Sequence, residues 1–74
     1  MANSCILVRL TVGKHQDTLE EARKFDEVKE AFFVFGRYDM IVLARAQDRD
    51  SLIRVAAKIS ALPGVRATET LIEA

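Results

Sequence analysis

The feature that most constrains this chain is a pair of apolar runs separated by only four residues. Residues 31–35 and 40–44 are rich in aromatic and aliphatic side chains, and residues 36–39 lie between them. Gly36 can adopt the positive φ that a tight reversal needs. The spacing therefore predicts a β-hairpin, whose turn is either a solvated connection or one wall of a site for a small polar molecule.

The length of the chain limits how much surface it can bury. Its 74 residues predict a single domain, 1–74, and a chain of this size buries only about 60% of the surface that its unfolded form exposes. The single cysteine, Cys5, excludes an intramolecular disulfide. Small domains without such links often gain stability by oligomerising, so we expect an oligomer. Cys5 lies in an apolar strand pattern, which predicts a buried, unreactive thiol.

Charge and hydropathy exclude several classes of partner. The chain has 11 basic and 11 acidic residues, and the basic residues form no stripe that could follow a phosphate backbone. The apolar runs are too short to span a membrane, and the N-terminus lacks the pattern of a signal peptide. We therefore expect a soluble cytoplasmic protein that itself binds neither nucleic acid nor membrane.

Hydrophobic periodicity predicts four strands and two helices. Alternating patterns place strands at residues 4–12, 28–35, 40–46 and 65–73. Helical spacing places the first helix at 17–25, where Thr18 and Glu21 match a capping box. It places the second helix between an N-cap at Asp48 or Asp50 and the Pro63-Gly64 break.

The order of these elements predicts the fold. Strand, helix, strand, strand, helix, strand is the split βαβ, or ferredoxin-like, α+β arrangement, βαββαβ. It has one four-stranded antiparallel sheet with two helices on one face. The hairpin strands are apolar on both sides, with Phe33 and Phe35 on one face and Phe32 and Val34 on the other. We therefore expect a partner subunit to cover the open face of the sheet.

The sequence matches none of the common enzyme or cofactor templates. It has no Cys or His pair for a metal, no phosphate-binding glycine loop and no activated-serine motif. His15 stands alone ahead of the first helix and is interpreted as a surface residue. The third strand lacks the interleaved aromatic and basic residues of an RNA-binding sheet. We expect no metal, no cofactor and no catalytic residue.

The remaining polar groups suit a binding module. The hairpin offers backbone amides at Gly36 and Arg37 and the carboxylate of Asp39, and the last strand offers the hydroxyls of Thr68 and Thr70. An amide can donate to a ligand carboxylate, and Asp39 can accept from an ammonium group. The pattern therefore favours a zwitterion such as an amino acid.

Three short motifs carry a resemblance to a known family. They are Phe35-Gly36-Arg37-Tyr38-Asp39-Met40, Leu62-Pro63-Gly64-Val65 and Thr68-Glu69-Thr70. In this order and spacing the chain resembles the effector-binding (RAM) domain of the Lrp/AsnC, or feast/famine, transcriptional regulators.

The resemblance implies a ferredoxin-like domain that dimerises through its open sheet face, with dimers assembling into rings of eight or ten subunits. It implies that a small effector, usually an amino acid, binds between dimers, near the hairpin and the last strand. The site residues would then be Gly36, Arg37, Tyr38, Asp39, Thr68 and Thr70. Arg37 would either favour acidic ligands or be solvated. Family members carry an N-terminal DNA-binding half, and this chain begins at its first strand. It therefore resembles a stand-alone effector domain that could pair with full-length relatives.

Three hypotheses follow. The first is a ligand-responsive regulatory module that is not an enzyme. The second is a small dimeric α+β barrel enzyme of the monooxygenase or isomerase type, with Arg9, His15 and Tyr38 in an enclosed cavity. The third is a purely structural oligomerisation domain.

Overall fold

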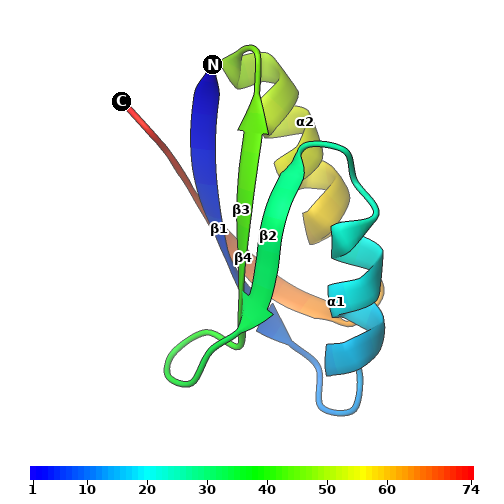
Figure 1. Ribbon diagram of the computed structural model, residues 1–74. Helices are drawn as coiled ribbons and strands as arrows, with labels where there is room; N and C mark the ends of the chain where they lie inside the picture. Colours follow the sequence, from blue (N-terminus) through cyan, green and yellow to red (C-terminus); the bar gives the residue numbers. More distant parts are fainter.

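A computed structural model describes residues 1–74 and has the predicted order of elements. The strands and helices are β1 (Ala2–Leu10), α1 (His15–Arg23), β2 (Val28–Phe33), β3 (Met40–Ala46), α2 (Arg49–Ser60) and β4 (Val65–Ile72). The four strands form one antiparallel sheet in the order β2-β3-β1-β4. Both helices lie on the same side of this sheet (Figure 1). The ferredoxin-like βαββαβ prediction is confirmed.

The core lies between the sheet and the two helices. Alternate residues of β1 and β3 point into it, and α2 adds residues three and four apart, as its helical spacing predicts. Leu19 and Ala22 of α1 are buried there too. The core residues are Ile6, Val8, Leu10, Leu19, Ala22, Ala31, Met40, Val42, Ala44, Ala46, Leu52, Val55 and Ile59. Neither helix is long and apolar enough to cross a membrane.

The register of the two central strands separates the faces of the sheet. Ile6 of β1 lies opposite Val42 of β3 and Thr70 of β4. Directly opposite residues in an antiparallel pair share a face. Because Ile6 and Val42 are buried, Thr70 also faces the helices. Glu69, its neighbour in β4, therefore lies on the open face.

The first strand is shorter at its C-terminal end than the alternation predicts. It ends at Leu10, and Val12, expected to continue the buried face, is 91% exposed. The amide of Leu10 donates to the carboxylate of Asp39, and the amide of Thr11 donates to the carbonyl of Gly64. The first bond replaces a strand partner with a side chain, and β1 ends at Leu10, two residues before Val12.

The second strand also ends early. It stops at Phe33, and Phe35, expected on the same face as Phe33, is fully exposed in the loop. The amide of Val34 donates to the carbonyl of Asp39 at 2.9 Å and closes the hairpin there. The apolar run of the sequence therefore continues past the point where the turn begins.

The predicted capping box at the first helix is wrong. The helix α1 begins at His15, its N-cap is Lys14, and no side chain caps it. Thr18 lies inside the helix and is buried, and its hydroxyl donates to the carbonyl of Pro63 at 3.1 Å. The three-residue spacing of Thr18 and Glu21 therefore does not mark the start of a helix here.

The prediction for the second helix is confirmed at Asp48. The side chain of Asp48 is the N-cap of α2 and accepts from the amide of Ser51 at 2.8 Å. This hydrogen bond holds the pKa of Asp48 below its ordinary value, because it favours the charged carboxylate.

Candidate functional site

The loop between β2 and β3 contains the predicted site residues 36–39. Gly36 has a φ of +136°, in the region that glycine adopts without steric cost. The loop closes through Val34 and Asp39, but the amides of Gly36 and Arg37 donate no hydrogen bond within the chain. The hairpin therefore presents two free backbone donors at an exposed tip.

Asp39 has partners within the chain. Its amide donates to the carbonyl of Val8 at 2.9 Å, and its Oδ2 accepts from the amide of Leu10 at 2.7 Å. Its Oδ1 lies 4.0 Å from Nε2 of His15, and the side chains of Asp39 and His15 are 39% and 42% exposed. Asp39 thus joins the hairpin to the end of β1, and its second oxygen remains accessible from solvent.

His15 is the first residue of α1 and does not precede the helix as predicted, and its side chain is 42% exposed, as expected of a surface residue. Its ring also meets the ring of Phe33 edge-on, with centroids 5.9 Å apart. No local pattern indicates that this residue approaches Asp39, 24 positions further along the chain.

Tyr38 extends from the hairpin to the edge strand. Its hydroxyl donates to Oε1 of Glu69 in β4 at 2.5 Å. This bond raises the pKa of Tyr38 above its ordinary value, while the nearby Arg37 and Arg9 guanidinium groups lower it. The sequence did not identify Glu69 as a partner of Tyr38, although the alternation of β4 places Glu69 on the open face.

Thr68 and Thr70 lie elsewhere. They are opposite Val8 and Ile6 in β1, so they face the helices from the edge strand. Neither hydroxyl makes a hydrogen bond within the chain. The structure therefore brings residues 36–39 together in one loop but leaves the two threonines on the opposite face of β4 from Glu69.

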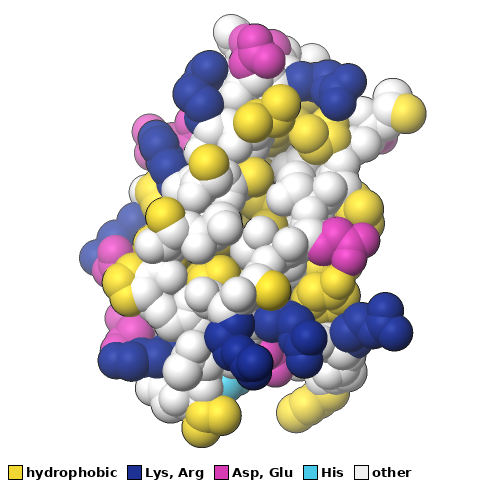
Figure 2. All heavy atoms as spheres, turned by 180° about the vertical axis from the view of Figure 1, so that it is seen from behind, with side chains coloured by type: hydrophobic (Ala, Val, Ile, Leu, Met, Phe, Trp, Pro, Cys, Tyr) yellow, Lys and Arg dark blue, Asp and Glu magenta, His cyan; other side chains and the backbone are white.

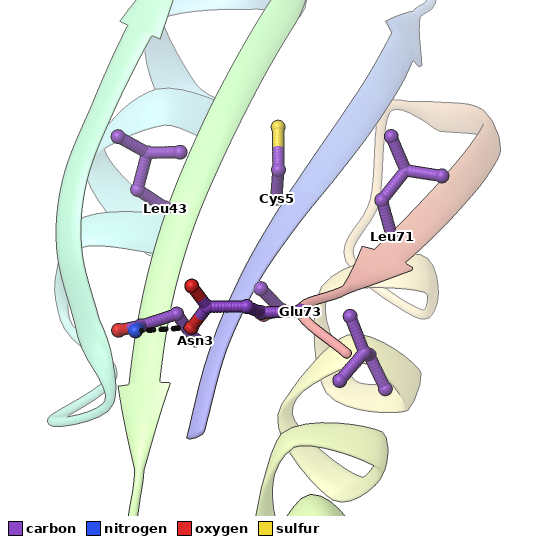
Figure 3. A pocket seen from close by; sticks show the side chains of 7 residues that line it. Asn3, Cys5, Leu43, Leu71 and Glu73 are labelled. Atoms are coloured by element: carbon purple, nitrogen blue, oxygen red, sulfur yellow. Dashed lines mark hydrogen bonds between the residues drawn. The ribbon is translucent and has the colours of Figure 1, made fainter. Parts of the chain in front are cut away.

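The open face of the sheet is apolar in its middle. Cys5, Leu43 and Leu71 project side by side from β1, β3 and β4 and line a shallow hollow of about 360 Å³ (Figure 3). At one end of the hollow, Nδ2 of Asn3 donates to Glu73 at 2.8 Å. Cys5 is only half-buried here, which corrects the expectation of a buried thiol.

Exposed apolar positions extend this surface. Leu71 is 51% exposed and Phe32 of β2 is 38% exposed, and Leu7, Ile41 and Leu43 are half-buried. Seen from behind, a group of Lys and Arg side chains lies in the lower part of the molecule, and hydrophobic side chains are exposed both above and below it (Figure 2).

The structure does not bring the residues of the enzyme hypothesis together. His15 lies beside Asp39, whereas Arg9 is near Tyr38, and none of the three surface hollows is lined by any of these residues. No three His, Cys, Asp or Glu side chains gather in a way that could hold a metal ion.

Comparison with known families identifies the chain. The family model of the Lrp/AsnC ligand binding domain matches residues 4–73. The chain belongs to the Lrp/AsnC ligand-binding domain family. The prediction made from the three short motifs is therefore confirmed, and the RAM-type fold agrees with it.

Individual relatives agree with this assignment. The crystal structure of TTHA0845 from Thermus thermophilus is 32% identical, with a TM-score of 0.93 over 99% of this chain and 92% of that one. The HTH-type transcriptional regulator FL11 of Pyrococcus horikoshii is 33% identical over 67 residues, which are 90% of this chain and 44% of FL11. This chain thus spans less than half the length of that regulator.

A more distant structure shares the fold. The transcriptional regulator NMB0573 of Neisseria meningitidis, solved as a complex with L-Met, is 21% identical, with a TM-score of 0.85 over 99% of this chain and 49% of that one.

Proposed function

We propose that this chain is a ligand-responsive, oligomeric regulatory module of the cytoplasm that binds an amino acid or a similar small metabolite between subunits. In this proposal it acts without enzymatic chemistry and without contacting DNA itself, alone or paired with full-length relatives of the family. The observation that carries the proposal is the free pair of amides at Gly36 and Arg37 beside the half-exposed carboxylate of Asp39.

The chemistry of this loop fits a zwitterion. The two free amides can donate to a ligand carboxylate, and Oδ1 of Asp39 can accept from an ammonium group. Arg37 makes no hydrogen bond within the chain and remains available to an acidic ligand side chain. The ligand bound by NMB0573, L-Met, belongs to the same chemical class.

The position of the threonines explains why the site would lie between subunits. Thr68 and Thr70 face the helices of their own chain and cannot line the hairpin tip beside Tyr38. In the proposed ring of dimers, the same hydroxyls of a neighbouring subunit would complete the site at the hairpin. We therefore propose that each site combines the hairpin of one subunit with the last strand of another.

The open face supports the first step of assembly. A contiguous apolar surface with a polar margin is typical of a protein interface. We propose that two copies pair through this face and that dimers associate further into rings of eight or ten subunits. Ligand bound between subunits would then stabilise the assembled state by mass action.

Calorimetric titration with each standard L-amino acid tests the binding claim. The wild type should bind at least one amino acid, Asp39→Asn should weaken that binding about tenfold, as expected for a lost charge-assisted hydrogen bond, and Asp26→Asn should leave it unchanged. Asp26 is the matched control because it lies in the turn after α1. Absence of heat from every amino acid, together with an unchanged particle mass, would refute sensing and leave a purely structural oligomerisation domain.

Analytical ultracentrifugation tests the interface separately. Leu43→Asp places a charge in the middle of the open face and should shift the particle to monomer. Ile53→Asp is the matched control, because Ile53 is 53% exposed on the outer side of α2. An unchanged mass for Leu43→Asp would show that the subunits pair through another surface.

A further inference from the structure

The tip of the hairpin is held by one side chain. The ends of the loop are fixed by backbone hydrogen bonds of Val34 and Asp39, but no backbone amide from residue 35 to residue 38 donates within the chain. Among these four residues only Tyr38 makes a side-chain hydrogen bond, to Glu69. Phe35 is fully exposed and offers no packing. The order of the tip therefore depends on the Tyr38–Glu69 contact.

This contact crosses a whole strand. Glu69 lies opposite Leu7 of β1, and β1 lies between β4 and β3, the strand that follows the hairpin. The hydrogen bond thus fastens the hairpin tip to the edge strand, 31 residues away in sequence. Asp39, the next residue, is bonded to Val8 and Leu10 of β1. The loop is therefore held at its end by Asp39 and at its tip by Tyr38.

We propose that Glu69 is a positioning residue of the hairpin site: by accepting from Tyr38 it holds the tip so that the amides of Gly36 and Arg37 remain oriented for a ligand carboxylate. This inference rests on the proposed function. A donor to a carboxylate makes a stronger bond than a donor to a neutral acceptor. Glu69 also lies on the open face, so a second copy covering that face would exclude water from the bond and strengthen it.

The composition provides a spectroscopic test. The chain has one tyrosine and no tryptophan, so the near-ultraviolet absorbance of tyrosinate reports Tyr38 alone. Removing Glu69 should allow Tyr38 to ionise at lower pH in Glu69→Ala, with a smaller change in Glu69→Gln, which keeps an acceptor. Glu73→Ala is the matched control, because Glu73 also accepts a hydrogen bond at the same edge of the sheet. Identical titrations of wild type and Glu69→Ala would refute the contact.

A second measurement at neutral pH tests the positioning role without ligand. Backbone amide order parameters from NMR relaxation should fall at Gly36 and Arg37 in Glu69→Ala, from about 0.85 towards about 0.6, remain close to wild type in Glu69→Gln and be unchanged in Glu73→Ala. Unchanged order parameters in Glu69→Ala would show that the tip does not depend on Glu69.

Binding then tests the functional consequence. For the amino acid that gives the largest heat with the wild type, affinity should fall about threefold to tenfold in Glu69→Ala and recover in Glu69→Gln. Unchanged affinity in Glu69→Ala overturns the inference. If no amino acid binds the wild type, the proposed function fails, and the order parameters still decide whether Glu69 holds the hairpin.

Discussion

Adding a single methyl group at Gly64 should cause a large loss of stability. It lies in the turn between α2 and β4 and has a φ of +95°. Its carbonyl accepts from the amide of Thr11 at 2.7 Å, so this turn also holds the end of β1. We predict that Gly64→Ala strongly destabilises the fold.

The structure gives two separate costs. A Cβ at Gly64 would lie 2.7 Å from Cβ of Lys14 and 2.7 Å from Oγ1 of Thr18. A residue with a side chain at this φ costs about 1–2 kcal/mol, and forcing an extra methyl into a packed contact adds about 1–3 kcal/mol. Neither neighbour can rotate away freely, because Cβ of Lys14 is fixed to the backbone and Thr18 donates to Pro63. The expected loss is about 2–5 kcal/mol, against a total stability of about 4–11 kcal/mol for a domain of this length.

Urea unfolding followed by far-ultraviolet circular dichroism measures this loss. Because assembly contributes to stability, all variants must be compared at one protein concentration. Gly13→Ala is the matched control: Gly13 has a φ of +87°, and a Cβ there would meet nothing within 4 Å. It should therefore show only the backbone cost, about 1–2 kcal/mol.

A double-mutant cycle tests the contact itself. Thr18→Ala removes one of the two atoms that the new methyl would meet, so Gly64→Ala should cost less in the Thr18→Ala background than in the wild type. If Gly64→Ala and Gly13→Ala are equally destabilising, the close packing of the α2–β4 turn against α1 has no energetic role and the reasoning is wrong.

Two further predictions concern carboxylates. Asp39→Ala leaves the amide of Leu10 without its acceptor and should lower the free energy of unfolding in urea by about 1–3 kcal/mol. Asp39→Asn keeps an acceptor and should lower it clearly less. Equal losses of stability in the two variants would contradict the role of this hydrogen bond. The amide of Ser51 lowers the pKa of Asp48 in the folded state. The carboxylate therefore stabilises the fold fully above the pKa of the unfolded chain, about 3.9, and this stabilisation is lost as pH falls through the lower pKa of the folded state. The difference in urea midpoint between wild type and Asp48→Asn should accordingly narrow below about pH 4, and a constant difference would contradict the prediction.

The local patterns were sufficient to predict the fold. The third strand was predicted with the bounds that the structure has, because Met40, Val42 and Ala44 alternate with Ile41 and Leu43 in the sequence. The second helix was predicted from Leu52, Val55 and Ile59 and from its N-cap at Asp48. These signals lie within one element, so a single sequence contains them.

The errors involve contacts between elements. Thr18 has the spacing of a capping residue, but its hydroxyl binds Pro63, 45 residues further along the chain. Val12 and Phe35 continue apolar runs, but β1 ends where the amide of Leu10 donates to Asp39, and β2 ends where the hairpin closes between Val34 and Asp39. A local pattern cannot reveal distant partners such as Pro63 for Thr18 or Asp39 for Leu10, whereas the end of β2 is set within the hairpin itself.

The same distinction applies to the candidate site. The loop residues 36–39 were predictable, because the turn that contains them is local. The contact of Tyr38 with Glu69 and the orientation of Thr68 away from the hairpin were not, because both depend on strand register. The two oxygens of Asp39 have different roles. Oδ2 accepts from the amide of Leu10 in β1, and Oδ1 is the oxygen left for a ligand. A truncation to alanine removes both roles at once, so only a variant that keeps an acceptor, such as Asp39→Asn, can separate ligand binding from the stability of the hairpin.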